Sequence, residues 1–159
     1  MNKLPNILSS FNLMIIQKAL IWMFFGSIFI GVFLNAMNIL ANKFNDLYFD
    51  APTLIYSALF MASNMCILEI IMHYYMHHKF ELYLFIFFCF FFFFCIFLLR
   101  YQLAVNEKGY LKRMISHHST AITTSKEILK KTNNLQVADI AQNIINNQKK
   151  EINYMKSLL

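Results

Sequence analysis

The sequence predicts an all-α membrane protein, with three transmembrane helices followed by a two-helix hairpin. The 159 residues are 58% hydrophobic and only 14% charged, and they include 18 Phe against 3 Gly. This composition is too apolar for an ordinary soluble domain. Three apolar runs are long enough to cross about 30 Å of hydrocarbon. We therefore expect an N-terminal segment over residues 1–18, a membrane domain over residues 19–100 and a hairpin domain over residues 101–159.

The expected spans cover residues 19–40, 52–73 and 82–99. The third is the most apolar, because it contains five consecutive Phe and no side chain more polar than Tyr83. Only a membrane or a very large core tolerates such a run. The sequence thus indicates a multi-pass integral membrane protein with the lipid bilayer as a partner. The distribution of Lys and Arg leans toward a cytoplasmic C-terminal domain, and it leaves the side of that domain open.

Positive charge gathers in the C-terminal third of the chain. From Arg100 onward there are ten Lys or Arg and four acids, and this difference (10 − 4) accounts for the whole formal net charge of +6. The stretch has no nucleic-acid-binding motif, so we expect no nucleic-acid partner. Attraction to anionic lipid headgroups is the simpler explanation of the charge.

After Leu99 the apolar residues recur at alternating spacings of four and three, which is typical of amphipathic helices. The two predicted stripes are Leu111, Ile115, His118, Ile122, Ser125 and Leu129, then Val137, Ala141, Ile144, Gln148, Glu151, Met155 and Leu158. Asn133 and Asn134 suit a turn and a helix N-cap between them, and Asn106 and Gly109 mark the joint with the third span. Two helices cannot cover both stripes, so we expect a homodimer that completes a four-helix bundle.

A candidate metal site follows from the antiparallel pairing of these two helices. If the chain folds about Asn133, facing residue numbers add to about 266, which brings His118 level with Gln148. Imidazole and thioether groups then meet along the seam, and this pair of ligands suits copper. The expected ligands are His117, His118, Met114, Glu151, Met155 and Gln148.

A structural interpretation competes with the copper site. A Met stripe at helical spacing is most often core, and adjacent His are often surface residues. In this alternative the hairpin only drives assembly of a membrane complex, and His118 with Gln148 forms a buried polar pair that sets the register of the bundle. An enzyme is not expected, because the hairpin has no paired E-x-x-H, no H-E-x-x-H and no nucleophile triad.

Two linked motifs resemble a known family. The stretches YLKRMISHHSTAITTSKEIL and VADIAQNIINNQKKEINYMKSLL resemble the ferritin-like family known as domain of unknown function 305, in its branch with three N-terminal membrane helices. The matching positions are Met114, Ile115, His117, His118, Ala121, Ala141, Ile144, Ile145, Gln148, Glu151, Ile152 and Met155.

The resemblance implies a helical bundle and, for some members, copper binding outside the cytoplasm in metal tolerance. This chain has Ser116 where relatives often carry Pro, and Thr120 and Thr124 where they carry an extra Met.

The second span carries another candidate face of ligands. Its members follow one another mostly at steps of four, so they share one side of a helix. They are Met61, Met65, Glu69, His73, Met76 and His77. An ionisable residue in a span is expected to face a partner and not lipid, which makes a second metal or relay site one interpretation. The other is a packing face with Met as filler and His at the interface.

Overall fold

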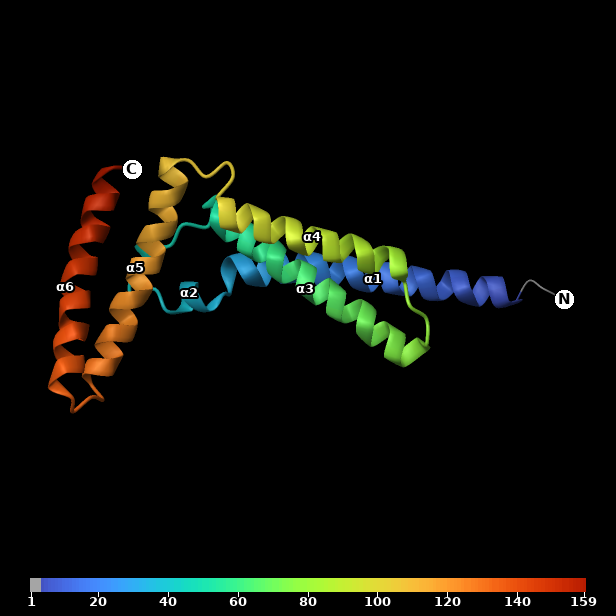
Figure 1. Cartoon of the computed structure of the whole chain (residues 1–159), viewed down its shortest axis with the longest axis horizontal. Coiled ribbons are helices and arrows are strands. Elements are labelled where there is room, and N and C mark those ends of the chain that lie inside the picture. The colour runs from blue at the N-terminus through green and yellow to red at the C-terminus, as the bar shows by residue number, and fades with distance from the viewer. Residues whose placement is uncertain (1–3) are drawn as a thin grey trace. The chain divides into compact units, whose positions relative to one another are not determined.

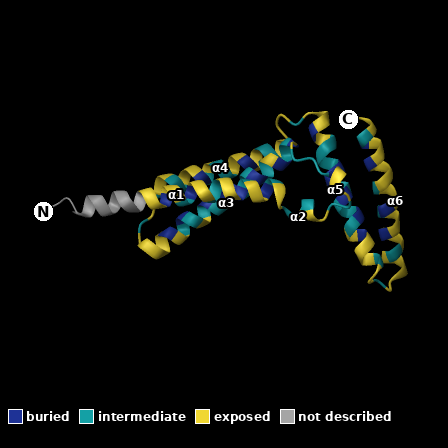
Figure 2. Ribbon diagram, turned by 180° about the vertical axis from the view of Figure 1, so that it is seen from behind, coloured by how far each residue is buried: buried dark blue, intermediate teal, exposed yellow. Residues whose placement is uncertain are grey.

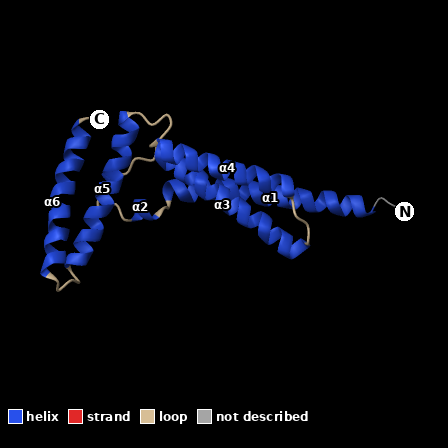
Figure 3. Cartoon of the chain, in the orientation of Figure 1, coloured by secondary structure: helices blue, strands red, loops and turns tan. Residues whose placement is uncertain are grey.

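The computed structural model describes residues 4–159 and the side chains of residues 14–159. All the regular elements in this part of the chain are helical (Figures 1 and 3), which confirms the all-α prediction. In chain order they are α1 (Leu4–Phe33), α2 (Ala36–Ile39), the 3-10 helix η1 (Phe44–Asp46), α3 (Pro52–His77), α4 (Leu82–Tyr101), α5 (Glu107–Leu129) and α6 (Leu135–Ser157).

The helices form two compact units. The first contains the described residues up to Gly31 together with residues 56–101, and the second contains residues 32–55 and 102–159. The first unit therefore holds most of α1, α3 and α4. The second holds α5 and α6 together with the connection between α1 and α3.

The first unit provides three helices that are long and apolar enough to cross a membrane, over Met14–Ile39, Pro52–His77 and Leu82–Tyr101. They enclose a small core that contains Leu20, Cys66 and Phe88. Many of their residues are exposed (yellow in Figure 2), including large apolar ones such as Trp22, which is 79% exposed, and Phe90, which is 71% exposed. Broad exposed apolar surface is unfavourable in water. This unit is compatible with a membrane protein.

The limits of the first helix differ from the prediction. It begins at Leu4, within the expected N-terminal segment, and ends at Phe33, before the expected end at residue 40. Two asparagines explain the end: the Asn35 side chain caps α2, and the Asn38 amide donates to the Val32 carbonyl at 2.6 Å. Such side chains compete with the helical ladder for backbone groups. The other two spans begin where predicted, at Pro52 and Leu82, and each continues a few residues further.

The second unit is built on α5 and α6, which pack against each other along their length. Asn106 caps α5 by accepting from the Gly109 amide at 2.8 Å, and Asn134 caps α6 by accepting from the Gln136 amide at 2.9 Å. These caps explain why both helices begin where they do. Their shared core consists of Ile115, Ile122, Ile152 and Met155.

The buried stripe of α6 is rotated from the predicted one. Ala141 and Met155 are buried as expected, but Ile145 and Ile152 complete the stripe, while Val137, Glu151 and Leu158 are exposed. The rotation packs Ile152 against Ile115 and Ile122 of α5 and also buries Ile145, so it removes two isoleucines from water. It also moves Glu151 to the edge of the seam.

Residues of the connection between α1 and α3 cover one side of α5. Both α2 and η1 contact α5, and the buried Ser116 and Ser119 donate hydrogen bonds to Asp46 there. Small hydroxyl side chains allow the backbone of residues 34–51 to approach the helix closely while its polar groups find partners. The connection between the first two spans is thus part of the same unit as the hairpin.

Candidate metal site

The centre of the candidate site is a contact between α5 and α6. His118 Nδ1 lies 2.9 Å from Glu151 Oε2, with the two side chains 15% and 52% exposed. The two atoms are close enough for an ion pair, but the ring N–H is not aligned as a hydrogen bond, so Nδ1 remains without a hydrogen-bond partner. Glu151 is one helical turn from Gln148, the residue expected to lie level with His118.

Gln148 supplies a second unsatisfied polar atom. Its side chain is half-buried, and Oε1 has no hydrogen-bond partner among the described residues. Buried polar atoms are nearly always paired in folded proteins, so each exception indicates a water, an ion or a ligand. A buried imidazole nitrogen on α5 and a buried amide oxygen on α6 are thus both unsatisfied, and a carboxylate contacts the imidazole.

Burial lowers the pKa of His118 below its ordinary value, and the neighbouring His117 lowers it further. Glu151 opposes both effects, but the net direction is downward. The neutral imidazole, which is the form that binds metals, is therefore the favoured state at neutral pH. His117 is exposed, and its ring centroid lies 5.9 Å from that of His118.

The two methionines lie in the core and not at the metal-site edge. Met155 is only 9% exposed within the buried cluster, and Met114 packs against that cluster. This is the filler role that methionine commonly takes. The residues in contact at the edge of the seam are His118 and Glu151, with His117 beside His118.

Across residues 14–159, no three His, Cys, Asp or Glu side chains gather closely enough to hold a metal ion. The hairpin thus brings one imidazole and one carboxylate into contact, and the Gln148 amide lies one turn before that carboxylate on α6. These are nitrogen and oxygen donors, a set suited to divalent copper, zinc or nickel more than to cuprous ion.

The second-span residues share one side of α3 but differ in burial. His73 is buried and its Nε2 has no hydrogen-bond partner, while its ring centroid lies 4.6 Å from that of His77. Met61, Met65 and Glu69 are half-buried, whereas Met76 and His77 are exposed. This face brings a His pair together without assembling a three-ligand cluster among the described residues.

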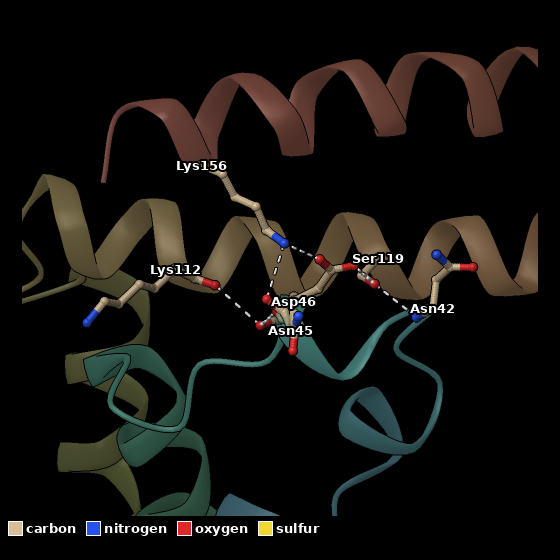
Figure 4. A network of polar contacts seen from close by, with 7 residues as sticks. Asn42, Asn45, Asp46, Lys112, Ser119 and Lys156 are labelled. Atoms are coloured by element: carbon tan, nitrogen blue, oxygen red, sulfur yellow. Dashed lines mark hydrogen bonds and ion pairs between the residues drawn. The ribbon is translucent and has the colours of Figure 1, made fainter.

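Sequence reasoning missed a buried polar network around Asp46 (Figure 4). The Asp46 carboxylate is 3% exposed, and it accepts from Ser119 Oγ at 2.6 Å and from Lys156 Nζ at 2.6 Å. Ser116 donates to the Asp46 carbonyl at 2.8 Å, and the Asn42 amide donates to Ser119 at 2.9 Å. A serine within a helix carries no signal for a distant partner. The sequence of the hairpin therefore did not predict a contact with Asp46.

Two comparisons place the chain among known proteins. The family model described as domain of unknown function (DUF305) matches residues 98–159. The chain is also 33% identical, over 133 residues, to an uncharacterized protein of Acanthamoeba polyphaga mimivirus, and the aligned stretch covers 82% of this chain and 85% of the viral protein. No solved structure matches.

The viral similarity is longer than the family domain, so it reaches into the apolar helices that precede α5. Together the two matches settle the relationship. The chain belongs to the DUF305 family, and the domain of that family is its C-terminal part, residues 98–159.

Proposed function

We propose that this protein is a membrane-anchored metal-binding protein whose site is the exposed edge of the α5–α6 seam. One observation carries the proposal: His118 Nδ1 lies 2.9 Å from Glu151 Oε2 of the facing helix, and Gln148, one turn before Glu151, has a buried side-chain oxygen without a hydrogen-bond partner. A metal ion is one ligand that would satisfy such atoms together.

Divalent copper is the metal we propose. The donor set of imidazole, carboxylate and amide oxygen suits Cu²⁺, and the lowered pKa of His118 keeps its ring neutral and ready to bind. The family resemblance, which implies copper for some members, favours the same ion. His117 is close enough on the surface to add a second imidazole after a rotamer change.

The anchor rests on the first unit. Its three helices are long and apolar enough to cross a bilayer, and their outward surfaces carry rings such as Trp22 and Phe90. We propose that all three cross the membrane and that the second unit lies in water at the membrane surface. The net charge of +6 on residues 100–159 would attract anionic lipid headgroups to the second unit.

Two copies of the chain could pair through the edge of the α5–α6 seam that carries His117 and Glu151. Such pairing would complete both the four-helix bundle and the metal site. Exposed apolar side chains lie on that edge at whole-turn spacings from His117 and Glu151. They are Tyr110, Ile128, Ile140 and Tyr154, which are 55%, 42%, 58% and 67% exposed. A two-fold pairing of this edge would cover these side chains and bring the His118 and Glu151 of two copies together, which would supply the ligands that one hairpin lacks.

The test is a Cu²⁺ titration of the full chain in uncharged detergent, with the copper electron paramagnetic resonance spectrum as the readout. The variant His118→Gln with Glu151→Gln should lose affinity by at least about tenfold and should lose nitrogen hyperfine structure. The control His78→Asn with Glu127→Gln removes an equal set of groups elsewhere, and Asn tolerates the positive φ of 52° at position 78. Equal binding by the two variants would end the proposal.

A structural role is the second candidate, favoured by the close His118–Glu151 contact and by the lack of a three-ligand cluster in residues 14–159. In that case the pair sets the register of the bundle and binds no ion. Metal chelators would then leave the oligomer and its thermal transition unchanged, whereas a copper-bridged dimer would dissociate or melt earlier.

A further inference from the structure

A second polar cavity lies on the opposite edge of the α5–α6 seam from His118 and Glu151. It has a volume of about 160 Å³ and is lined by Asn42, Lys43, Asp46, Ile122, Lys149, Ile152, Asn153 and Lys156. Its apolar lining is two buried isoleucines, and its polar lining comes from the connection between α1 and α3 and from α6. A cavity of about 150 Å³ can hold a benzene-sized molecule, so a tetrahedral anion fits this one.

The charge of the cavity is strongly positive. Three lysines, Lys43, Lys149 and Lys156, line it against the single acid Asp46. That carboxylate is already paired, because it accepts from Lys156 and from Ser119 within the network shown in Figure 4. Two lysines, Lys43 and Lys149, are therefore left without an acid in the cavity.

Neutral donors complete the set. The Asn42 side-chain oxygen accepts from Lys126 Nζ at 2.6 Å, which leaves its amide nitrogen free to donate. Asn153 lies one turn from Lys149 and Lys156 on the same side of α6. Ammonium and amide donors converging on a small concavity are the groups that recognise phosphate oxygens.

We propose that this cavity binds a phosphate group, held by Lys43 and Lys149 with the amides of Asn42 and Asn153. The group is the headgroup of an anionic lipid or a free phosphate, since both present the same oxygens. Lys43 lies in the connection between α1 and α3, and if these helices cross the membrane as proposed above, the connection lies near the lipid headgroups. The inference concerns different residues from the copper site, so either can fail alone.

The experiment uses the full chain in two settings. In uncharged detergent, inorganic phosphate is titrated and binding is measured by calorimetry. In phosphatidylcholine vesicles, with and without spin-labelled phosphatidic acid, enrichment of the labelled lipid around the protein is measured by electron paramagnetic resonance. The variant Lys43→Gln with Lys149→Gln is compared with Lys130→Gln with Lys131→Gln, which removes the same charge at the α5–α6 turn.

A phosphate site predicts that the Lys43 and Lys149 variant loses affinity by about tenfold in at least one setting, while the turn variant stays close to the wild type. Loss in detergent identifies free phosphate as a ligand, and loss only in vesicles identifies the lipid headgroup. Lys43→Arg with Lys149→Arg should retain binding, and unchanged circular dichroism shows that the glutamine variant folds. Equal loss in both charge-removal variants, or no saturable binding in either setting, overturns the proposal.

Discussion

The Lys156 ammonium lies 2.6 Å from the carboxylate of Asp46, a side chain that is 3% exposed. This pair joins the end of α6 to the connection between α1 and α3, and the residues are 110 positions apart in the chain. Ser119 of α5 binds the other carboxylate oxygen at 2.6 Å, so one acid holds three segments together. The family domain begins at residue 98, and its stability here therefore depends on an acid that lies outside it.

Asp46→Ala should destabilise the second unit by about 2 to 4 kcal/mol, because it leaves the partly buried Lys156 with only the Asn45 carbonyl as a partner and Ser119 without its acceptor. Hydrogen exchange of the α5 and α6 amides in the full chain measures this free energy locally. The control Asp139→Ala removes an exposed acid from α6 and should change exchange by less than about 0.5 kcal/mol. Equal exchange rates in the two variants would show that the Asp46 network contributes nothing.

Stability of the second unit should fall in mild acid because of His118. Burial holds its pKa below the ordinary 6.5 in the folded chain, so between these two values the unfolded chain binds more protons. The contribution is fully present above pH 6.5 and is lost as the pH falls toward the folded pKa. Unfolding of the full chain, followed at several pH values, should show this slope. His118→Gln should remove it, and His117→Gln should leave most of it.

Length and apolar composition were enough to predict the helical fold, because each span can satisfy its backbone only as a helix. The helices α3 and α4 begin at Pro52 and Leu82, where the second and third apolar runs were predicted to begin. The end of α1 did not, since it depends on the Asn38 side chain reaching the Val32 carbonyl. The starts of α5 and α6 could be predicted, because Asn106 and Asn134 are recognisable helix N-caps.

The site could be predicted only in part. Helical spacing predicted that His118 lies level with Gln148, but the rotation of α6 about its axis is set by the burial of Ile145 and Ile152, and the residue in contact with His118 is Glu151. Met155 lies in the core, as the predicted stripe had it. Asp46 lay beyond prediction, because its partners Ser119 and Lys156 come from helices far along the chain, and no local pattern marks such a contact.

Met155→Leu should leave Cu²⁺ affinity within about twofold and change the unfolding free energy by less than about 1.5 kcal/mol, since it is a volume-conserving change in an apolar core. The Met155 side chain is 9% exposed within the Ile115, Ile122 and Ile152 cluster, where its sulfur acts as filler. Copper titration and thermal unfolding of the same variant measure both quantities. A large loss of copper affinity with unchanged stability would make Met155 a ligand and return the site to the mixed His and Met set.

Gly31→Leu should destabilise the first unit by about 1 to 3 kcal/mol, because overpacking forces shifts in close-packed helices. A Cβ at position 31 would lie 2.9 Å from the Ala58 Cα, and a backbone atom cannot move aside as a side chain can. The matched control is Gly26→Leu in the same helix, where an added Cβ meets nothing within 4 Å. The measurement is the midpoint of unfolding of the full chain by sodium dodecyl sulfate in mixed micelles, which should be lower for Gly31→Leu than for Gly26→Leu. Equal midpoints would mean that α1 and α3 do not pack closely at Gly31 and Ala58.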